Sequence, residues 1–512
     1  MPDWRSQVTS ASCAAAPSFL RTLLFSDSVS RTMLHRLFPK VFSADKPSAF
    51  THTFATGRVL LEQHNGCIPH INLIPPELLS DIFTHAHHTS DNWLTGSVRS
   101  YEAPMLLLRI CKHWSAVATA TPNLWSNMSY TLEVDDGWAN VGRADRDSAM
   151  INNWLQRSDS PLSLQLDTTS FFVVSERTTH PVLDVFVTHC HRWQTINFSL
   201  YERLIPVLNT VKCCPMLRAV EIAVAGLSLK SEHTLYAFEH APLLRDVTLH
   251  IHPQMIKIPW GQLTHCSIEG GYECLDIMRQ SLVVETFSLE LKGTSRSSIL
   301  PPITLGSLLT LNIYSHVADL HPILDHILAP ALADITFRSS AMYGSTQTFQ
   351  FVPFLSRCSS TIQSIALCHV HPTEDELIRC LRETPSLRKL TIKEVILANC
   401  VGHTLLQALH ACGGSSICLV RNLQEIVLCG SFAGWDEDLF VDAVESRWRM
   451  AKVVNECPNA IQNLGCLQLK KVALMFASYH TMSKQTYRRL DEMKGEGLLV
   501  LCFRIIFAED GT

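Results

Sequence analysis

The sequence has little of the charge and few of the long apolar runs that are typical of nucleic-acid-binding and membrane proteins. Charged residues make up only 17% of the 512 residues, and no long basic stripe is present. The longest apolar run near the C-terminus, Leu498–Phe503, is followed by Arg504. It is therefore too short for the roughly 20 residues that cross a bilayer, and we interpret it as a buried strand. We expect neither nucleic acid nor membrane among the partners.

Closely paired cysteines are also absent. The 18 cysteines are scattered, and none forms a C-x-x-C pair, which argues against a zinc module. Secreted disulfide scaffolds are shorter and denser in cysteine. Cys111, Cys266 and Cys502 lie inside apolar runs, where free cysteine behaves as a small buried hydrophobic residue. We therefore expect a cytoplasmic or nuclear protein with no metal and no other cofactor.

The motifs of common enzyme classes are missing. No G-x-S-x-G, H-E-x-x-H or G-x-G-x-x-G pattern occurs. Three H-x-H pairs, which begin at His189, His250 and His369, have the spacing that places two imidazoles on one face of a strand. A third metal ligand is not apparent, so we interpret them as exposed strand ends. We expect no catalytic residues, and an unrecognised hydrolase with a convergent triad is the enzymatic alternative.

The first 60 residues differ in composition from the rest of the chain. They are rich in serine, threonine, alanine and phenylalanine, contain few acids, and include Arg5, Arg21, Arg31 and Arg36. A mitochondrial presequence has this composition. We favour the alternatives of a disordered tail or an incorrectly assigned first exon. Residues 1–66 are accordingly predicted to be a weakly structured tail.

Residues 67–130 predict two helices that begin at prolines. In the first, Pro76 suits the opening turn, and Glu77 lies near the positive end of the helix dipole. Its apolar residues recur at helical spacing and form one stripe that contains Leu78, Leu79, Ile82 and Phe83. The second helix, over residues 103–118, repeats this spacing with Leu107, Ile110, Cys111, Trp114 and Val117. The turn Thr121–Trp125 closes the segment.

A repeated pattern follows a connector over residues 131–158, which is predicted to be helical over Ser148–Gln156. From residue 159 to 508, short apolar strands alternate with helices. Eleven strands carry an apolar-x-x-apolar-x-apolar anchor, and these anchors begin at Trp193, Leu217, Leu244, Leu263, Val284, Leu308, Leu332, Ile362, Leu387, Leu423 and Leu469. Most anchors are 19 to 30 residues apart, and the last two gaps are 36 and 46. Most of this spacing is near the roughly 20–29 residues of leucine-rich repeats.

Helix boundaries strengthen the anchor pattern, which is weak alone because 46% of the residues are apolar. Pro215, Pro242, Pro330 and Pro385 each stand just before an anchor, where proline ends a helix and starts an extended segment. Thr373–Glu376 has the sequence of a capping box at a helix start. Such units bury their apolar faces only by stacking, and the stack leaves a long strand surface for a partner. The asparagine of regular repeats is missing, so we predict an irregular array.

Five short motifs occur in order between residues 74 and 125. The first two are Ile74–Leu79 and Ile82-Phe83. The next three are Leu107-x-x-Ile110-Cys111, Trp114 and Pro122-x-Leu124-Trp125. Together they resemble the F-box, and they are most similar to the F-box-like proteins that are abundant in mushroom-forming fungi. The irregular repeats behind them fit the same family.

This resemblance implies a fold and a function. The fold class would be α/β, with an all-α three-helix F-box-like module followed by an irregular leucine-rich-repeat-like α/β solenoid. The chain would be the substrate receptor of a Skp–cullin–F-box ubiquitin ligase, with an unknown target protein bound by the repeats. The surface that faces the Skp adaptor would contain Pro75, Glu77, Leu78, Leu79, Ile82 and Phe83, while Leu107, Ile110 and Trp114 would hold the module together or extend the contact. The alternative is a leucine-rich-repeat interaction scaffold in which the helices only cap the array.

Overall fold

The chain forms a mixed α/β structure, which confirms the predicted class at that level. The computed structural model divides it into two compact units, Met1–Leu243 and Leu244–Thr512. The predicted tail over residues 1–66 lies outside the described part of the chain. The structure describes residues 74–88, 104–131, 139–168, 178–226, 233–271, 273–292, 301–316, 321–339, 351–358, 361–396, 400–410, 419–431, 435–456 and 466–507.

The first unit opens with helices, which we call the helical module (residues 74–125). They are α4 (Pro76–His88), α5 (Leu107–Ile110), α6 (Lys112–Thr119) and the 3-10 helix η3 (Pro122–Trp125). The single helix expected over residues 103–118 is wrong, because Cys111 is extended (φ −156°, ψ 168°) and separates α5 from α6. The Cys111 Sγ accepts a hydrogen bond from the Trp114 N–H at 3.4 Å, so this cysteine caps α6.

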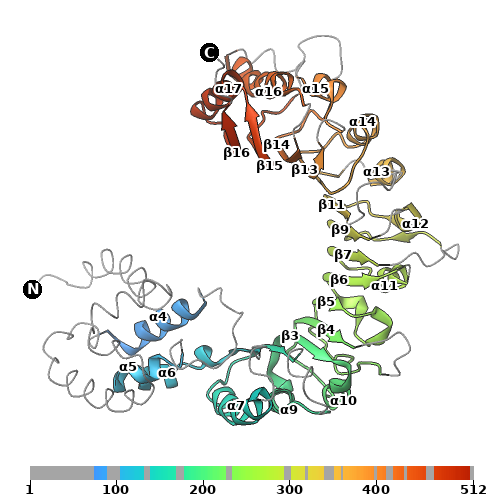
Figure 1. The fold of residues 1–512 in the computed structure, drawn as a ribbon. Helices are drawn as coiled ribbons and strands as arrows, with labels where there is room; N and C mark the ends of the chain where they lie inside the picture. Colours follow the sequence, from blue (N-terminus) through green and yellow to red (C-terminus); the bar gives the residue numbers. More distant parts are fainter. Residues whose placement is uncertain are drawn as a thin grey trace, which may run out of the picture. The chain divides into compact units, whose positions relative to one another are not determined.

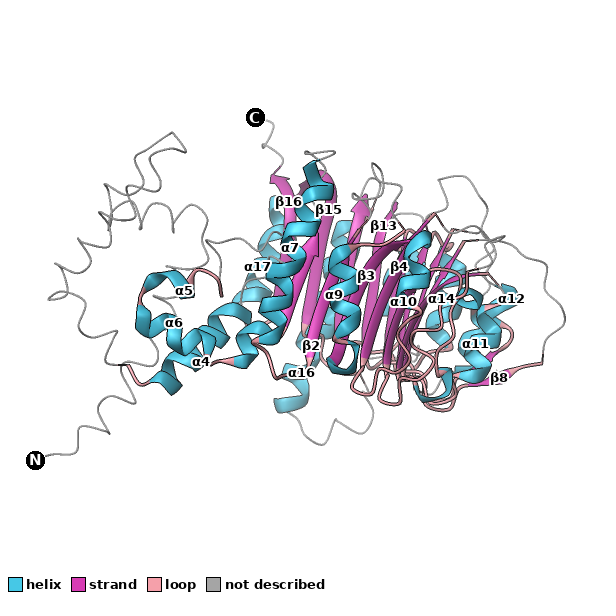
Figure 2. Cartoon of the chain, turned by 90° about the horizontal axis from the view of Figure 1, so that it is seen from below, coloured by secondary structure: helices cyan, strands magenta, loops and turns pink. Residues whose placement is uncertain are grey.

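The same unit continues as four parallel strands, in the order β1-β2-β3-β4. Helices α7, α9 and α10 lie along one face of these strands (Figure 2). Strand β1 follows η3 directly, and α7 includes the helix that was predicted over 148–156. The bounds are β1 (Asn127–Thr131), α7 (Ala139–Gln156), β2 (Leu162–Asp167), α9 (Pro181–Thr188), η5 (Cys190–Arg192), β3 (Trp193–Tyr201), η6 (Glu202–Leu204), α10 (Ile205–Leu208) and β4 (Ala219–Ala225).

In its described residues, the second unit contains a sheet of ten strands in the order β5-β6-β7-β9-β11-β12-β13-β14-β15-β16, and neighbouring strands are parallel. Helices α11 to α15 lie on one side of them (Figure 1). Strands β8 (Ile303–Thr304) and β10 (Ile327–Leu328) form a separate pair. The sheet strands are β5 (Asp246–His250), β6 (His265–Gly270), β7 (Thr286–Leu291), β9 (Thr310–Ser315), β11 (Asp334–Ser339), β12 (Ser364–Cys368), β13 (Lys389–Ile396), β14 (Glu425–Ser431), β15 (Lys471–Met482) and β16 (Leu499–Phe507).

Helices alternate with most of these strands, as the pattern predicted. The α14 capping box is confirmed, because Thr373 Oγ1 accepts from the Glu376 N–H at 3.3 Å and Glu376 accepts from the Thr373 N–H at 2.9 Å. The helices are η7 (Pro253–Met255), η8 (Trp260–Gln262), α11 (Cys274–Gln280), α12 (His321–Leu324), α13 (Val352–Cys358), α14 (Glu374–Arg382), α15 (His403–Leu409), α16 (Glu437–Glu456) and α17 (Lys484–Gly495).

The eleven predicted anchors form the core of both units. All 33 of their side chains are at most 4% exposed, as for Leu308, Leu311 and Ile313. A backbone pattern repeats with them in the second unit. The carbonyl oxygen just before one strand accepts two N–H bonds from the start of the next, as Glu285 does from Leu309 and Thr310 at 2.8 and 2.9 Å. The same double acceptance recurs at Arg245, Thr264, Leu309, Ala333, Gln363, Arg388 and Gln424.

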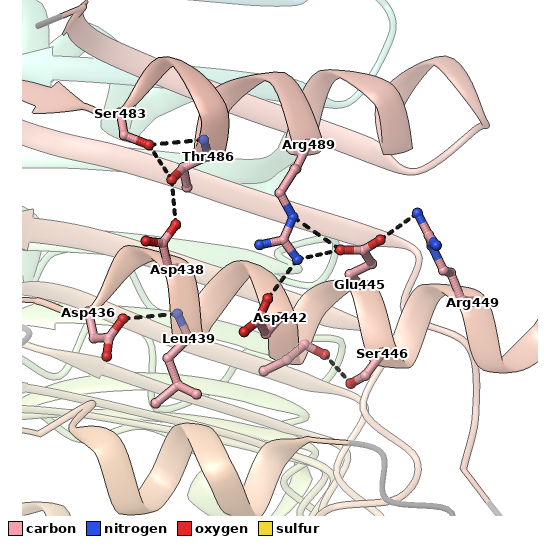
Figure 3. A network of polar contacts seen from close by, with 11 residues as sticks. Asp436, Asp438, Leu439, Asp442, Glu445, Ser446, Arg449, Ser483, Thr486 and Arg489 are labelled. Atoms are coloured by element: carbon pink, nitrogen blue, oxygen red, sulfur yellow. Dashed lines mark hydrogen bonds and ion pairs between the residues drawn. The ribbon is translucent and has the colours of Figure 1, made fainter.

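The last two helices of the second unit are joined by side chains (Figure 3). Arg489 of α17 bonds Asp442 Oδ1 of α16 at 2.6 Å and also contacts Glu445. Near the start of α17, the Thr486 hydroxyl donates to Asp438 Oδ1 at 2.8 Å. Burial raises the pKa of the nearby Glu437 carboxyl, and Asp438 and Asp436 add to this rise. Polar contacts, in addition to apolar packing, therefore hold α17 on α16.

Candidate functional site

The helical module is built around two large aromatic contacts. In the first, the Phe83 ring of α4 packs on the Trp114 ring of α6, with centroids 4.9 Å apart and planes tilted by 56°. Leu79 of α4 and Leu107 of α5 are completely buried as well. Because Phe83 and Trp114 come from different helices, this contact determines how α4 lies on α6.

The second contact closes the module and ties it to the following helix. The Trp125 Nε1–H donates to the Ala118 carbonyl at 2.8 Å, and the Trp154 Nε1–H donates to the Trp125 carbonyl at 3.1 Å. The Trp125 and Trp154 rings meet edge to face with centroids 5.1 Å apart. Thr121 also donates to the Ser80 hydroxyl at 2.9 Å, which joins the closing turn to α4. The module is thus connected to α7 through Trp154.

The nine residues predicted to bind the adaptor fall into two groups. Leu79, Phe83, Leu107 and Trp114 are buried core residues. The other five are accessible: Leu78 is 51% exposed, Ile110 is 39% exposed, Pro75 and Glu77 are exposed, and Ile82 is partly exposed. Leu78 and Ile110 are therefore large apolar side chains that the module presents to solvent. Their role in adaptor binding stays a prediction.

Helix α6 also contains two buried polar atoms without a hydrogen bond. Within the described residues, Trp114 Nε1 and His113 Nε2 have no partner. Burying an unpaired polar group costs about 1–3 kcal/mol. In contrast, Trp125 and Trp154 each donate their indole N–H. The Trp114 side chain therefore stabilises the module through packing.

The histidine pairs do not form metal sites in the described part of the chain. His189 and His191 lie at the end of α9 and in η5, so the prediction that they share a strand face is wrong. His252 lies past the end of β5 and bonds Glu273 Oε1 at 2.9 Å. His369 follows β12 with a positive φ of 54°. The described residues contain no group of three or more His, Cys, Asp or Glu that could hold a metal ion.

The face of the second-unit sheet that carries the half-exposed side chains is a second candidate surface. Five consecutive strands from β5 to β11 place small polar residues in one register: Thr248, Ser267, Ser288, Asn312 and Thr336. The Asn312 amide donates to the Ser288 hydroxyl at 3.1 Å. The row continues over β12 to β16 as Ala366, Thr391, Val427, Ala473 and Leu501. The row therefore changes from half-exposed polar residues to largely apolar residues, of which Val427 and Ala473 are buried.

An ion-pair cluster flanks the polar half of this row. The neighbouring acids Glu269 and Glu290 share Lys292, whose Nζ lies 2.5 and 3.4 Å from their carboxylates. His316 approaches Glu290 Oε1 at 3.1 Å. The hydrogen bond to Glu269 raises the pKa of Lys292. The sequence pattern did not point to these residues, although Glu290 lies between two buried residues of β7.

Among the helices that the structure describes, none combines the length and apolar character needed to span a membrane. No protein-family model matches the chain, and no curated protein gives a significant match to it.

Proposed function

We propose that this chain is the substrate receptor of a Skp–cullin–F-box ubiquitin ligase. The helical module would bind the Skp adaptor, and the strand array would bind the target protein in the cytosol or nucleus. The chain would contribute no catalytic group. It would raise the local concentration of the target near the ubiquitin-transferring partner enzymes and orient the target there.

The observation that carries this proposal is that α4 and α5 each bury some apolar side chains and expose others. Leu79 and Phe83 bury one side of α4, while Leu78 on the same helix remains exposed. Ile110 at the end of α5 is exposed as well. A contiguous exposed apolar patch is typical of a surface that a partner covers, and Leu78 and Ile110 would belong to such a patch. These residues also occupy F-box-like positions in the sequence.

The repeated strands support the second half of the proposal. Stacked repeats present an extended face on which many side chains contribute to recognition. Here that face offers hydroxyl, amide and carboxylate groups over β5 to β11, whereas Thr391, Val427 and Ala473 farther along the row are buried. A target protein would therefore contact the face through its polar part.

A capping role for the helices is the alternative function, and one contact favours it. The bond from Trp154 to the Trp125 carbonyl fixes the closing turn of the module to α7. A module that served only to cap the strands would need such a connection. It would not need Leu78 and Ile110 at its surface.

Adaptor capture by the full chain distinguishes the two functions. The variant Leu78→Asp/Ile110→Asp is expected to reduce co-purification of a Skp adaptor and a cullin at least tenfold, while thermal unfolding stays unchanged. The control Met216→Asp/Leu243→Asp changes two residues of similar exposure, 38% and 43%, outside the module. It is expected to capture adaptor like the wild type. A wild-type chain that captures no Skp adaptor would contradict the proposal.

A further inference from the structure

The outermost strands of the two units differ in how they are protected from pairing. β1 is the outer strand of the first unit and has five residues, Asn127–Thr131, most of them polar. β16 ends the strand order of the second unit and has nine residues, Leu499–Phe507, of which only Arg504 is charged. Edge strands are commonly kept apart by shortness, charged side chains or proline. β16 is long and lacks proline, and Arg504 is its single charged residue.

The backbone of β16 has one side bonded and one side open within the described residues. The Leu499 N–H donates to the Lys470 carbonyl beside β15 at 3.1 Å. Along a strand, the N–H and C=O groups of every second residue point to the same side, and those of the residues between them point to the other side. Leu499 and Leu501 therefore bond toward β15, and the backbone groups of Val500 and Cys502 point to the open edge.

The side chains of β16 favour an apolar partner strand. Val500 packs into the core of the unit, whereas Leu499 is 49% exposed on the other face and Leu501 is half-buried. A strand added at the open edge would place its own side chains beside Leu499 and Leu501. Cross-strand apolar pairs then add to the backbone hydrogen bonds.

We propose that β16 pairs with β16 of a second copy of this chain, antiparallel about a two-fold axis. In an antiparallel pair, residues whose backbone groups point to the shared edge lie opposite one another. Residues of even number must therefore pair with residues of even number. A register centred on Phe503 obeys this rule, and it pairs all nine residues with Leu499 opposite Phe507.

The single charge of the strand is compatible with this register. Arg504 lies opposite Cys502, so the two arginines of the dimer do not face each other. A register centred on Arg504 itself would place like charges directly opposite, which is destabilising. It would also pair only seven of the residues 499–507. Because the two-fold axis uses the same edge of β16 in both copies, this contact closes at two copies.

Proline at Cys502 tests the pairing. Cys502→Pro removes an N–H that points to the open edge and leaves the bonds to β15 intact, and edge strands tolerate proline at such positions. Light scattering on size-exclusion fractions should give the wild type about twice the chain mass of 57.4 kDa. The Cys502→Pro variant should be a monomer. The control Cys502→Ala loses the same side chain but keeps the N–H, and it should remain a dimer.

Hydrogen exchange of the unmodified chain provides a second measurement, which does not depend on a variant's folding. Amides of residues 499–507 should exchange more slowly at high protein concentration than at low concentration. A wild type that is monomeric at all concentrations, equal exchange at both, or a dimeric Cys502→Pro variant would overturn the proposal. A monomeric wild type whose β16 binds a strand of another protein would do so as well. This dimer does not rest on ligase function, so adaptor capture by Cys502→Pro should be unchanged.

Discussion

The helical module and the strand array are held together in different ways. The module depends on a few large contacts that occur once, such as Phe83 on Trp114 and Trp125 on Trp154. In the array, each anchor has three buried side chains. In the second unit, a backbone carbonyl that accepts two N–H bonds from the next strand also recurs. One substitution should therefore remove a much larger share of the module's stabilisation than of the array's. Stability in the array is instead spread over neighbouring repeats.

The largest expected effect comes from a charge in the module core. Phe83 is completely buried, so Phe83→Asp loses the contact with Trp114 and buries an unpaired carboxylate. The expected cost exceeds about 4 kcal/mol, which is more than most single substitutions. Hydrogen exchange should show α4 and α6 unprotected while the strands of the second unit stay protected.

The exposed neighbour of Phe83 serves as the control. Leu78→Asp on the same helix should leave the exchange of α4 and α6 unchanged, because Leu78 is half in solvent. Equal loss of protection in Leu78→Asp and Phe83→Asp would contradict the division into core and surface. Loss of protection in the second-unit strands of Phe83→Asp would contradict the independence of the array.

The next expected effect is a loss of stability of the first unit as the pH falls. Burial lowers the pKa of His180 to about 4 from 6.5, and the charge of Asp145 opposes this change. The folded state therefore holds His180 neutral, and the unfolded state binds its proton first as the pH falls. Stability should be full above pH 6.5 and should fall by on the order of 3 kcal/mol toward pH 4.

Thermal unfolding of the first unit between pH 7 and 4 measures this loss. His180 lies before α9 and faces the ring of Tyr130 in β1, with centroids 6.2 Å apart. His180→Gln removes the titrating group and should flatten the pH dependence of the melting temperature. An unchanged pH dependence in this variant would assign the loss to other groups.

The sequence predicted the array well because its signal is repeated. The apolar positions at Leu308, Leu311 and Ile313 look ordinary alone, but eleven such anchors with similar spacing are not. Strand β1 was missed because Trp125, Met128 and Tyr130 make an anchor of the same spacing inside a segment that was assigned to the module. Aromatic residues there fit a closing turn and a strand equally well.

The sequence did not predict which side chains of the module face inward or where its second helix is interrupted. Leu78 and Leu79 were placed on one stripe, yet adjacent helix residues differ by about 100° in direction, and the structure buries only Leu79. Periodicity alone does not decide which of two neighbours faces inward. The break at Cys111 depends on a thiol that accepts the Trp114 N–H, and cysteine within an apolar run gives no sign of that role.

Two tryptophans of the module allow a smaller, matched comparison. Trp125→Phe removes the donor to the Ala118 carbonyl, which keeps its bond from the Thr121 N–H at 3.3 Å, so the expected cost is about 1 kcal/mol. Trp114→Phe removes an indole N–H that has no hydrogen bond within the described residues. The Trp114 variant should therefore lose less stability in chemical unfolding. A larger loss for Trp114→Phe would mean that ring volume outweighs hydrogen bonding in the module.

The smallest effect is expected in the array's last helix, where the stabilisation is spread over several groups. Arg489 contacts Asp442 and Glu445 of α16, and the hydrogen bond to Glu445 raises the pKa of its guanidinium. Arg489→Gln should cost about 1 kcal/mol, since ion pairs that are partly open to solvent contribute little, and less still at high salt. Arg488→Gln is the control, because Arg488 is 81% exposed and bonds Glu492 within α17 itself. Hydrogen exchange of α17 should increase in Arg489→Gln alone. Complete unfolding of the second unit by that one change would mean that the array, like the module, depends on single contacts.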